Sequence, residues 1–194
     1  MRVHAVETEV KFHVVDLPAL RADLSARGAL ATQPRHLERN ALFDDRERSL
    51  TRRGMLLRLR DALDARLTFK APAPPGQQNS QYKARVEIEI AVSDHEAAFT
   101  MLTALGYTAW WRYEKYRESF RLNDVTLSLD HTPIGDFVEI EGPPESIRPT
   151  AEQLGLDWAA RSLQTYRELF LEAGLTDRTD MIFKGTQMNT DTHG

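Results

Sequence analysis

The sequence predicts an α+β protein: an eight-stranded antiparallel β-barrel that forms a tunnel with a charged interior, with helices packed outside. About eight short segments alternate apolar and polar residues, as half-buried strands do, and eight strands are enough to close a barrel. The polar faces of these segments are nearly all charged, whereas a face in water normally mixes charged and neutral residues. Four helical segments are present to cover the apolar faces.

Composition narrows the class of protein. The chain has 194 residues, of which 41% are hydrophobic and 28% charged, and this indicates one globular domain rather than a disordered chain. A net charge of −4 offers no basic field to a nucleic-acid polymer, and the absence of cysteine excludes disulfides and thiolate chemistry. No segment has the apolar length of a secretory signal or a membrane span. We therefore expect a cytoplasmic enzyme or binding protein with no membrane partner.

The first expected strand is VETEVKF, residues 6–12. Val10 and Phe12 fall on one face, while Glu7, Glu9 and Lys11 fall on the other. One face is suited to a core, and the other carries two carboxylates and an ammonium in a row. The same alternation predicts strands within the segments 37–43, 56–60, 66–70, 83–92, 114–120, 124–130 and 137–141.

Helices are expected between and after these strands. Residues 16–28 begin with Asp16 as N-cap and end at Gly28. Residues 93–106 show the same signals, with Ser93 or Asp94 as N-cap and Gly106 at the end. Two further helices are expected at 144–155 and 157–174. The Pro- and Gly-rich residues 71–81 predict a loop. We expect one domain over residues 1–184 and a disordered polar tail over 185–194.

The charged faces follow a pattern that solvation does not explain. Alternate residues of a strand point the same way, roughly 6.5–7 Å apart, so a Glu-X-Glu pair repels itself unless a cation lies nearby. Three such pairs occur, and one Arg-X-Arg pair matches them. The pairs are Glu7 and Glu9, Glu87 and Glu89, Glu139 and Glu141, and Arg58 and Arg60. If helices cover the apolar faces, these charges line the inside of the barrel.

Charge balance then indicates what such a tunnel would hold. Seven carboxylates and eight cations point inward by parity, which leaves the interior at +1. They are Glu7, Glu9, Glu87, Glu89, Asp130, Glu139 and Glu141, and Lys11, Arg58, Arg60, Lys70, Lys83, Arg85, Lys115 and Arg117. Two divalent cations would raise the interior to +5, and a ligand with four or five negative charges would restore balance. A magnesium-bound triphosphate chain has this character, since Mg²⁺ prefers carboxylate and phosphate oxygens and arginine matches phosphate.

The order of motifs resembles a known family. Glu7-Thr8-Glu9-Val10-Lys11 is similar to the Glu-X-Glu-X-Lys signature of the CYTH domain, the triphosphate tunnel metalloenzymes. This superfamily includes class IV adenylyl cyclase, thiamine triphosphatase and inorganic triphosphatases. The later motifs LLRLR, LTFKAP, VEIEI, YEKYRESF, LSLD, GDFVEIEG and SLQTYRELF follow in family order, so the resemblance covers roughly residues 5–172.

The resemblance implies roles for these side chains. It implies a Mg²⁺ or Mn²⁺ cofactor held by Glu7, Glu9, Glu139 and Glu141. It implies that the triphosphate is bound by Lys11, Arg58, Arg60, Lys70, Arg85, Lys115 and Arg117. Glu9 and Lys11 are expected to be catalytic, and Glu87, Glu89 and Asp130 are expected to support the site. A homodimer is expected by analogy with the family.

The sequence leaves the reaction open. Phosphoryl transfer needs positioning and charge neutralisation more than covalent chemistry from the protein, so one tunnel serves several reactions. A triphosphatase would activate water, and this reaction is favoured because it needs no adenine pocket. A class IV cyclase would direct the ribose 3′-hydroxyl of ATP at the α-phosphate. A non-catalytic module would bind triphosphate or polyphosphate without turnover.

Two aromatic features also stay open. The segment YTAWWRY, residues 107–113, either stacks an adenine ring or forms a hydrophobic cluster over a turn, and the cluster is favoured. Tyr166 either points toward the tunnel, as in relatives, or packs in the core. His13 falls on the charged face by parity, although a hydrogen-bonding role outside the site is favoured.

Overall fold

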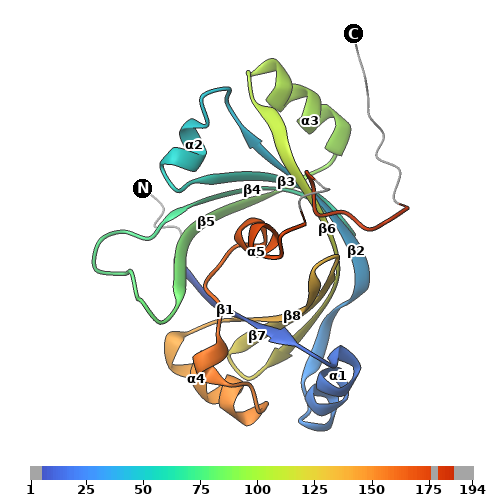
Figure 1. The fold of residues 1–194 in the computed structure, drawn as a ribbon, viewed down its shortest axis with the longest axis vertical. Helices are drawn as coiled ribbons and strands as arrows, with labels where there is room; N and C mark the ends of the chain where they lie inside the picture. The colour runs from blue at the N-terminus through green and yellow to red at the C-terminus, as the bar shows by residue number, and fades with distance from the viewer. Residues whose placement is uncertain (1–5, 176–178, 186–194) are drawn as a thin grey trace.

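Eight strands close into a barrel in the computed structural model, which describes residues 6–175 and 179–185. The order around the ring is β1-β5-β4-β3-β2-β6-β7-β8, and every neighbouring pair is antiparallel. Figure 1 looks through this ring. The strands are β1 (Val6–Val14), β2 (Leu30–Asp44), β3 (Leu56–Asp61), β4 (Ala65–Pro72), β5 (Lys83–Val92), β6 (Thr108–Leu122), β7 (Val125–Thr132) and β8 (Gly135–Glu141). The predicted fold class is confirmed.

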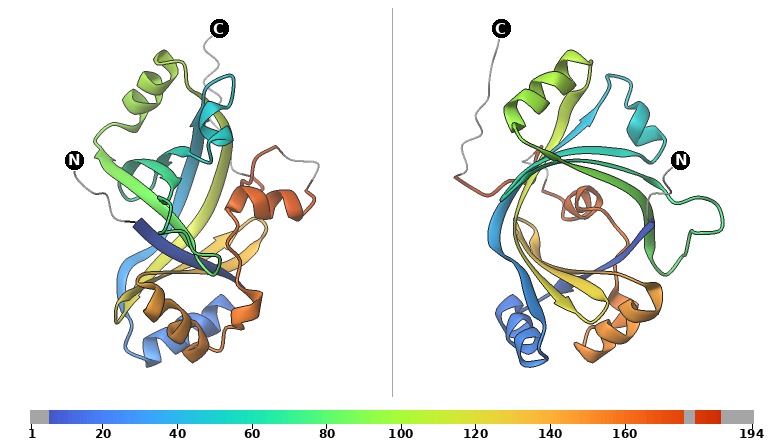
Figure 2. Two further views of the ribbon diagram at one scale, coloured as in Figure 1. Left: turned by 90° about the vertical axis from the view of Figure 1, so that its left-hand side faces the viewer. Right: turned by 180° about the vertical axis from the view of Figure 1, so that it is seen from behind.

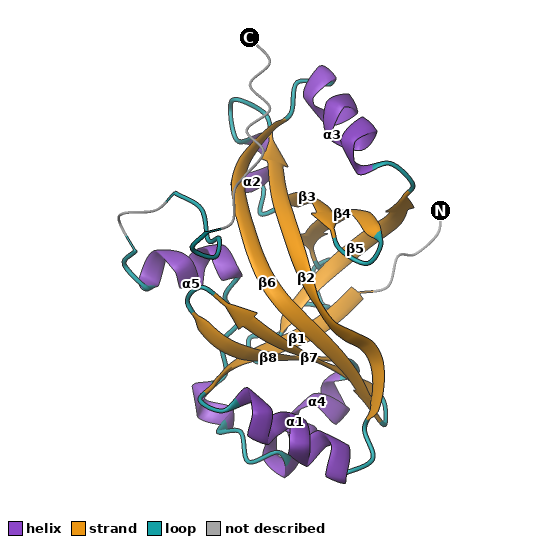
Figure 3. Cartoon of the chain, turned by 90° about the vertical axis from the view of Figure 1, so that its right-hand side faces the viewer, coloured by secondary structure: helices purple, strands orange, loops and turns teal. Residues whose placement is uncertain are grey.

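Helices cover the apolar outer face of the barrel in two places. The helices α1 (Leu17–Ala26) and α4 (Pro144–Gln153) lie side by side against β1, β7 and β8 (Figure 3). The helix α3 (His95–Ala104) lies on the far side, against β3. One short helix, α2 (Ser49–Arg52), was not predicted, and it follows the end of β2. Asp16 and Asp94 cap α1 and α3 through their side chains, as the sequence predicts for Asp16.

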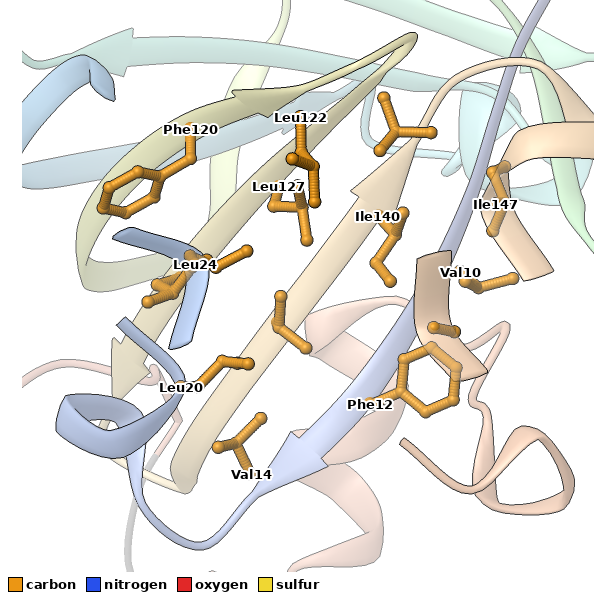
Figure 4. Close-up of a cluster of buried hydrophobic side chains, with 14 of the residues drawn as sticks. Val10, Phe12, Val14, Leu20, Leu24, Phe120, Leu122, Leu127, Ile140 and Ile147 are labelled. Carbon is orange, nitrogen blue, oxygen red and sulfur yellow. The ribbon is translucent and has the colours of Figure 1, made fainter. Parts of the chain in front are cut away.

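The main core lies between the strands and the first pair of helices. Leu24 of α1 and Ile147 of α4 are fully buried against Val138 and Ile140 of β8 (Figure 4). These side chains come from the apolar positions of the alternating strands and from one face of each helix. The outer face of the sheet is therefore the buried apolar face, which leaves the charged face of each strand for the interior of the barrel.

The predicted helix over 157–174 is wrong as a single element. The chain forms a 3₁₀ turn, η1 (Trp158–Ala160), and a separate helix, α5 (Tyr166–Glu172). Between them Ser162 pairs with Lys11 of β1, accepting a hydrogen bond from the Lys11 N–H at 3.0 Å and donating its own N–H at 2.7 Å. Backbone pairing with a strand is incompatible with helix, and the Thr165 capping box then starts α5.

The helix α5 also differs in place from the predicted outer helices. It lies across one open end of the barrel: it falls inside the outline of the ring in Figure 1 and beside the strands in Figure 3 and in the left view of Figure 2. Its first residue, Tyr166, is buried and reaches the barrel interior, where its hydroxyl donates to Asp130 at 2.6 Å. The reason is the Lys11–Ser162 pairing, which brings the chain across the end of the barrel before the helix begins.

The remaining segments agree with the prediction where the structure describes them. The loop expected over residues 71–81 spans residues 73–82, because β4 continues to Pro72. The expected polar tail, apart from its first glycine, lies outside the described residues. Within the described part of the chain, no helix combines the length and apolar character that crossing a membrane requires.

Truncating a core side chain tests the inside-out arrangement. We expect Leu24→Ala to lower the free energy of unfolding by about 2–5 kcal/mol, because Leu24 is 0% exposed and its removal leaves a cavity between α1 and the sheet. Denaturant unfolding followed by circular dichroism measures this change. Met101→Ala on α3, where Met101 is 63% exposed, is the control and should change stability by less than about 0.5 kcal/mol. Equal effects of the two substitutions would contradict this core.

Candidate functional site

The barrel interior contains a cavity of about 520 Å³ lined by the charged faces of the strands. Strand register sets which side chains face one another: Lys11 lies opposite Glu139, and Glu9 lies opposite Glu141 on β8. The cavity brings together every predicted site residue except Asp130. Lys83, which was predicted to point inward, also lines it. The predicted residues that line the cavity are Glu7, Glu9, Lys11, Arg58, Arg60, Lys70, Lys83, Arg85, Glu87, Glu89, Lys115, Arg117, Glu139 and Glu141.

The strand carboxylates that line the cavity lie on one side of the barrel, and half of the strand cations that line it lie on the opposite side. Three adjacent strands, β5, β1 and β8, carry the acidic wall, formed by Glu7, Glu9, Glu87, Glu89, Glu139 and Glu141. The strands β3 and β6 flank β2, which is four places from β1 in the ring of eight, and they carry the basic wall, formed by Arg58, Arg60, Lys115 and Arg117. A ligand in the tunnel therefore meets carboxylates interspersed with Lys11, Lys83 and Arg85 on one side, and guanidinium and ammonium groups on the other.

Carboxylates crowd together at one part of the acidic wall. Burial raises the pKa of Glu7 to about 9, and a hydrogen bond to Glu87 and the charge of Glu141 add to this effect. Burial likewise raises the pKa of Glu141, with Glu9 and Glu139 contributing. Lys70 is the nearby cation, in contact with Glu87 and 3.8 Å from Glu7. Like charges held this close are stabilised by a proton or by a cation.

The donor set of this part of the wall suits a divalent metal ion. Glu7, Glu9, Glu87 and Glu141 offer carboxylate oxygens only, which are the ligands that Mg²⁺ and Mn²⁺ prefer. Among residues 6–175 and 179–185, no three carboxylate or imidazole groups already converge on one metal position. The side chains are instead engaged with one another and with lysines. The residues therefore fit a metal by chemistry, and their present contacts are those of a charge-paired tunnel.

Glu139 has a different environment from the other carboxylates of the acidic wall. One oxygen lies 2.6 Å from Lys11 Nζ, and the other contacts Arg117. Burial alone would raise the pKa of Glu139, but Lys11 and Arg117 outweigh it and hold the pKa well below its usual range. Lys83 lies 3.5 Å from Glu9, so it belongs to the tunnel rather than to the solvent.

Asp130 lies behind the cavity surface and organises the basic wall. It is fully buried, and it accepts hydrogen bonds from Lys115 at 3.0 Å, from Arg117 at 2.7 Å and from the Tyr166 hydroxyl at 2.6 Å. Tyr166 therefore both packs against Phe137 and reaches the tunnel, so the two alternatives left by the sequence are both realised. The contact also ties α5 to the basic wall.

Sequence reasoning missed Glu38, a carboxylate of β2 with 1% exposure. It lies 3.4 Å from Arg60 and 3.6 Å from Lys115, within the basic wall. Burial raises its pKa, but Lys115 and Arg117 outweigh burial and lower it far below the usual range. With Glu38 the interior holds eight carboxylates and eight cations, so its formal charge is zero rather than +1. The alternation of LERNALF was the available signal, since it places Glu38 and Asn40 on one face.

Neutral side chains contact charged residues of both walls. Thr68 donates to Glu89 at 2.8 Å, and Arg58 donates to the Tyr113 hydroxyl at 3.3 Å. Trp111 stacks on Tyr113 at 5.0 Å, in agreement with the favoured hydrophobic cluster for this segment. His13 does not line the cavity and lies edge-on against Phe137.

Comparison with known proteins agrees with this geometry. The model of the CYTH domain family matches residues 5–178. A proposed adenylate cyclase from Vibrio parahaemolyticus is similar in structure, with a TM-score of 0.77 and 20% identity over 87% of this chain and 99% of that chain. A protein from Pyrococcus horikoshii has a TM-score of 0.68 and 25% identity over 84% and 98% of the two chains. No curated relative matches the chain significantly.

One further structure has a description that names an activity. It belongs to a proposed adenylyl cyclase from Hippeastrum with a dominant triphosphatase activity. The TM-score is 0.59 and the identity 16%, over 86% of this chain and 95% of that chain. At this identity the likeness concerns the fold.

Neutralising Glu38 tests the charge pairing of the basic wall. We expect Glu38→Gln to lower the free energy of unfolding by about 3–5 kcal/mol, because Arg60 and Lys115 would lose a buried partner. Chemical denaturation at neutral pH measures the change. Glu47→Gln is the matched control, since Glu47 is 82% exposed and its ion pair with Arg52 contributes little. A loss below about 1 kcal/mol for Glu38→Gln would show that water already screens the basic wall.

Proposed function

The chain belongs to the CYTH domain family, and from this premise we propose that it is a divalent-metal-dependent triphosphatase acting on inorganic or organic triphosphates. The observation that carries the proposal is the pair of opposite walls in a closed tunnel. Carboxylates of the acidic wall would hold divalent metal ions, and the guanidinium and ammonium groups of the basic wall would hold phosphate oxygens of the triphosphate.

Charge balance supports the same substrate class. An interior of eight carboxylates and eight cations is neutral, and two divalent cations would bring it to +4. Inorganic triphosphate and nucleoside triphosphates carry about four negative charges near neutral pH, so metal and substrate together leave the interior balanced. A substrate with a single phosphate would leave buried charge uncompensated, which is costly.

The proposed metal ligands follow from the crowding on the acidic wall. We assign Glu7, Glu9 and Glu141 as ligands, with Glu87 next to them. Glu139 would become a ligand only by releasing Lys11 and Arg117. The metal would polarise phosphate oxygens and help to activate the attacking oxygen.

The chain's own side chains would hold and orient the substrate. Arg58, Arg60 and Arg117 would bind phosphate oxygens from the basic wall, since guanidinium groups form two parallel hydrogen bonds to phosphate. Lys11, buried next to Glu139, would neutralise charge on the phosphate that is transferred. Glu9, next to Lys83, would position the water. Attack of water on the terminal phosphorus breaks its bond to the bridging oxygen. Inorganic triphosphate then gives orthophosphate and pyrophosphate, and an organic triphosphate gives orthophosphate and the organic diphosphate.

Cyclase activity is the second candidate, supported by the descriptions of similar structures from Vibrio parahaemolyticus and Hippeastrum. It would use the same walls with the ribose 3′-hydroxyl as nucleophile and would release cyclic AMP and pyrophosphate. Hydrolysis is preferred because it requires only water next to the phosphate. Binding without turnover is the third candidate, and the complete set of acidic side chains argues against it.

A product assay with an acidic-wall variant tests the proposal. The protein is incubated with inorganic triphosphate and separately with ATP, each with Mg²⁺ or Mn²⁺, and the products are resolved by chromatography. We expect orthophosphate and pyrophosphate from triphosphate, no turnover in EDTA, and a loss of more than about a hundredfold in Glu7→Gln/Glu9→Gln, because two ligands are neutralised.

The matched control is Glu145→Gln/Glu152→Gln, which removes two exposed carboxylates of α4 far from the cavity lining. This control should retain full activity. Formation of cyclic AMP from ATP would contradict the triphosphatase proposal and support the cyclase reaction instead. Metal-dependent binding of triphosphate without any product would contradict both reactions and support the non-catalytic binding module.

A further inference from the structure

A second cavity of about 410 Å³ opens beside the tunnel, and the function described above does not use it. Trp110, Trp111 and Arg167 line both this cavity and the main one, so the two are adjacent. Arg48 lines the second cavity but not the main one. We call the group of Arg48, Trp110 and Arg167 the mouth subsite.

A bulge in β6 places Trp110 at this junction. Leu42 of β2 pairs with Trp111, whereas the next residue, Phe43, pairs with Ala109, so Trp110 is an extra residue with no partner on β2. Bulges at barrel rims turn a side chain away from the regular alternation. Trp111 is 2% exposed and packs in the core, but Trp110 is only partly buried. Trp110 packs against the cluster that contains Trp111, and its partly exposed ring also lines both cavities.

Two arginines flank the Trp110 ring. The guanidinium carbon of Arg48 lies 4.1 Å from the ring centroid and that of Arg167 lies 5.9 Å from it. Within the part of the chain that the structure describes, neither guanidinium has a carboxylate at ion-pair distance, in contrast to Arg58, Arg60 and Arg117 in the tunnel. The charge of Asp180 still acts on Arg167 from beyond ion-pair distance, and both guanidinium groups retain N–H groups that can donate to acceptors on a ligand.

Arg48 is held in place by a strained and well-anchored turn. Its backbone has a φ of 58°, which is unfavourable for a residue with a side chain. The buried carboxylate of Asp44 fixes the turn by accepting hydrogen bonds from the backbone of Leu50 and Thr51 at 3.0 Å and 2.9 Å. The fold thus maintains an unfavourable conformation that sets the guanidinium over Trp110.

We propose that the mouth subsite binds the base of a nucleoside triphosphate whose phosphates occupy the tunnel. This inference rests on the proposed function and specifies its substrate class. A planar base would stack on Trp110 and on the guanidinium planes, and the arginine N–H groups would donate to its carbonyl or ring-nitrogen acceptors. Inorganic triphosphate would leave the mouth subsite without a contact, so the structure assigns to Trp110 the selection of nucleotides.

The test compares two substrates in the same variants. The KM values for ATP and for inorganic triphosphate are measured with Mg²⁺ in the wild type, Trp110→Ala, Trp110→Phe and Trp158→Ala. Stacking of one base on an aromatic side chain corresponds to roughly a five- to hundredfold effect, so the ratio of the ATP value to the triphosphate value should rise about tenfold in Trp110→Ala. Trp110→Phe, which keeps a ring, should restore most of the wild-type ratio.

Trp158→Ala is the matched control. Trp158 is also partly buried, and Arg161 and Arg148 lie 4.8 Å and 5.6 Å from its ring, but it packs on Phe12 and Tyr82 away from the cavity lining. Its ratio should equal that of the wild type. Thermal unfolding of each variant separates a loss of fold from a loss of selection.

An unchanged ratio in Trp110→Ala would overturn the inference and leave the proposed function standing. If, in addition, Arg48→Ala/Arg167→Ala binds long-chain polyphosphate more weakly, the mouth subsite is a phosphate site. If neither substrate is turned over, the proposed function fails. The same ratio is then taken from dissociation constants measured by calorimetry with Mg²⁺, and it decides the inference independently.

Discussion

Charge can be buried inside a protein only where opposite charge lies against it, and the rest of this structure depends on that constraint. Sixteen acidic and basic side chains point into one barrel, and most of them would be prohibitively costly there alone. Asp130 illustrates the solution: it is fully buried, yet Lys115, Arg117 and Tyr166 satisfy its carboxylate. The closed ring of strands is what allows eight charges of each sign to meet.

The pairing of charges differs between the two walls of the cavity. On the basic wall, Glu38 and Asp130 neutralise cations from behind the cavity surface, which leaves guanidinium groups oriented toward the tunnel. On the acidic wall, burial and the neighbouring Glu87 and Glu141 raise the pKa of Glu7, and Glu141 has no ion pair at salt-bridge distance among the described residues. Under the proposed function, the interior would exchange some of these internal pairs for a metal and a polyanion.

The inside-out barrel also explains the placement of the helices. Because the charged faces occupy the interior, the apolar faces of β1, β7 and β8 must be covered from outside, and α1 and α4 supply that cover (Figure 3). The helix α5 is the exception. It is positioned by the pairing of Ser162 with Lys11 and by the hydrogen bond from Tyr166 to Asp130, so its location depends on the tunnel and not on the outer core.

The sequence by itself determined which face of each strand is charged and how many strands there are. Alternation is a local property, so the inward positions of Glu7, Glu9, Lys11, Arg58 and Glu139 could be predicted from parity alone. The motif order was sufficient to indicate the family. The sequence could also have identified Glu38, whose parity is as clear as that of its neighbours on LERNALF.

Only the tertiary structure decided which charges meet. The ring order sets β1 opposite β2, and this creates two walls from strands that are distant in the sequence. It also decided that residues 157–174 do not form one helix, because Ser162 finds a strand to pair with. The bulge that turns Trp110 toward the tunnel mouth is likewise a consequence of register between two long strands. Propensity and parity describe one segment at a time, whereas pairing, register and closure arise between segments.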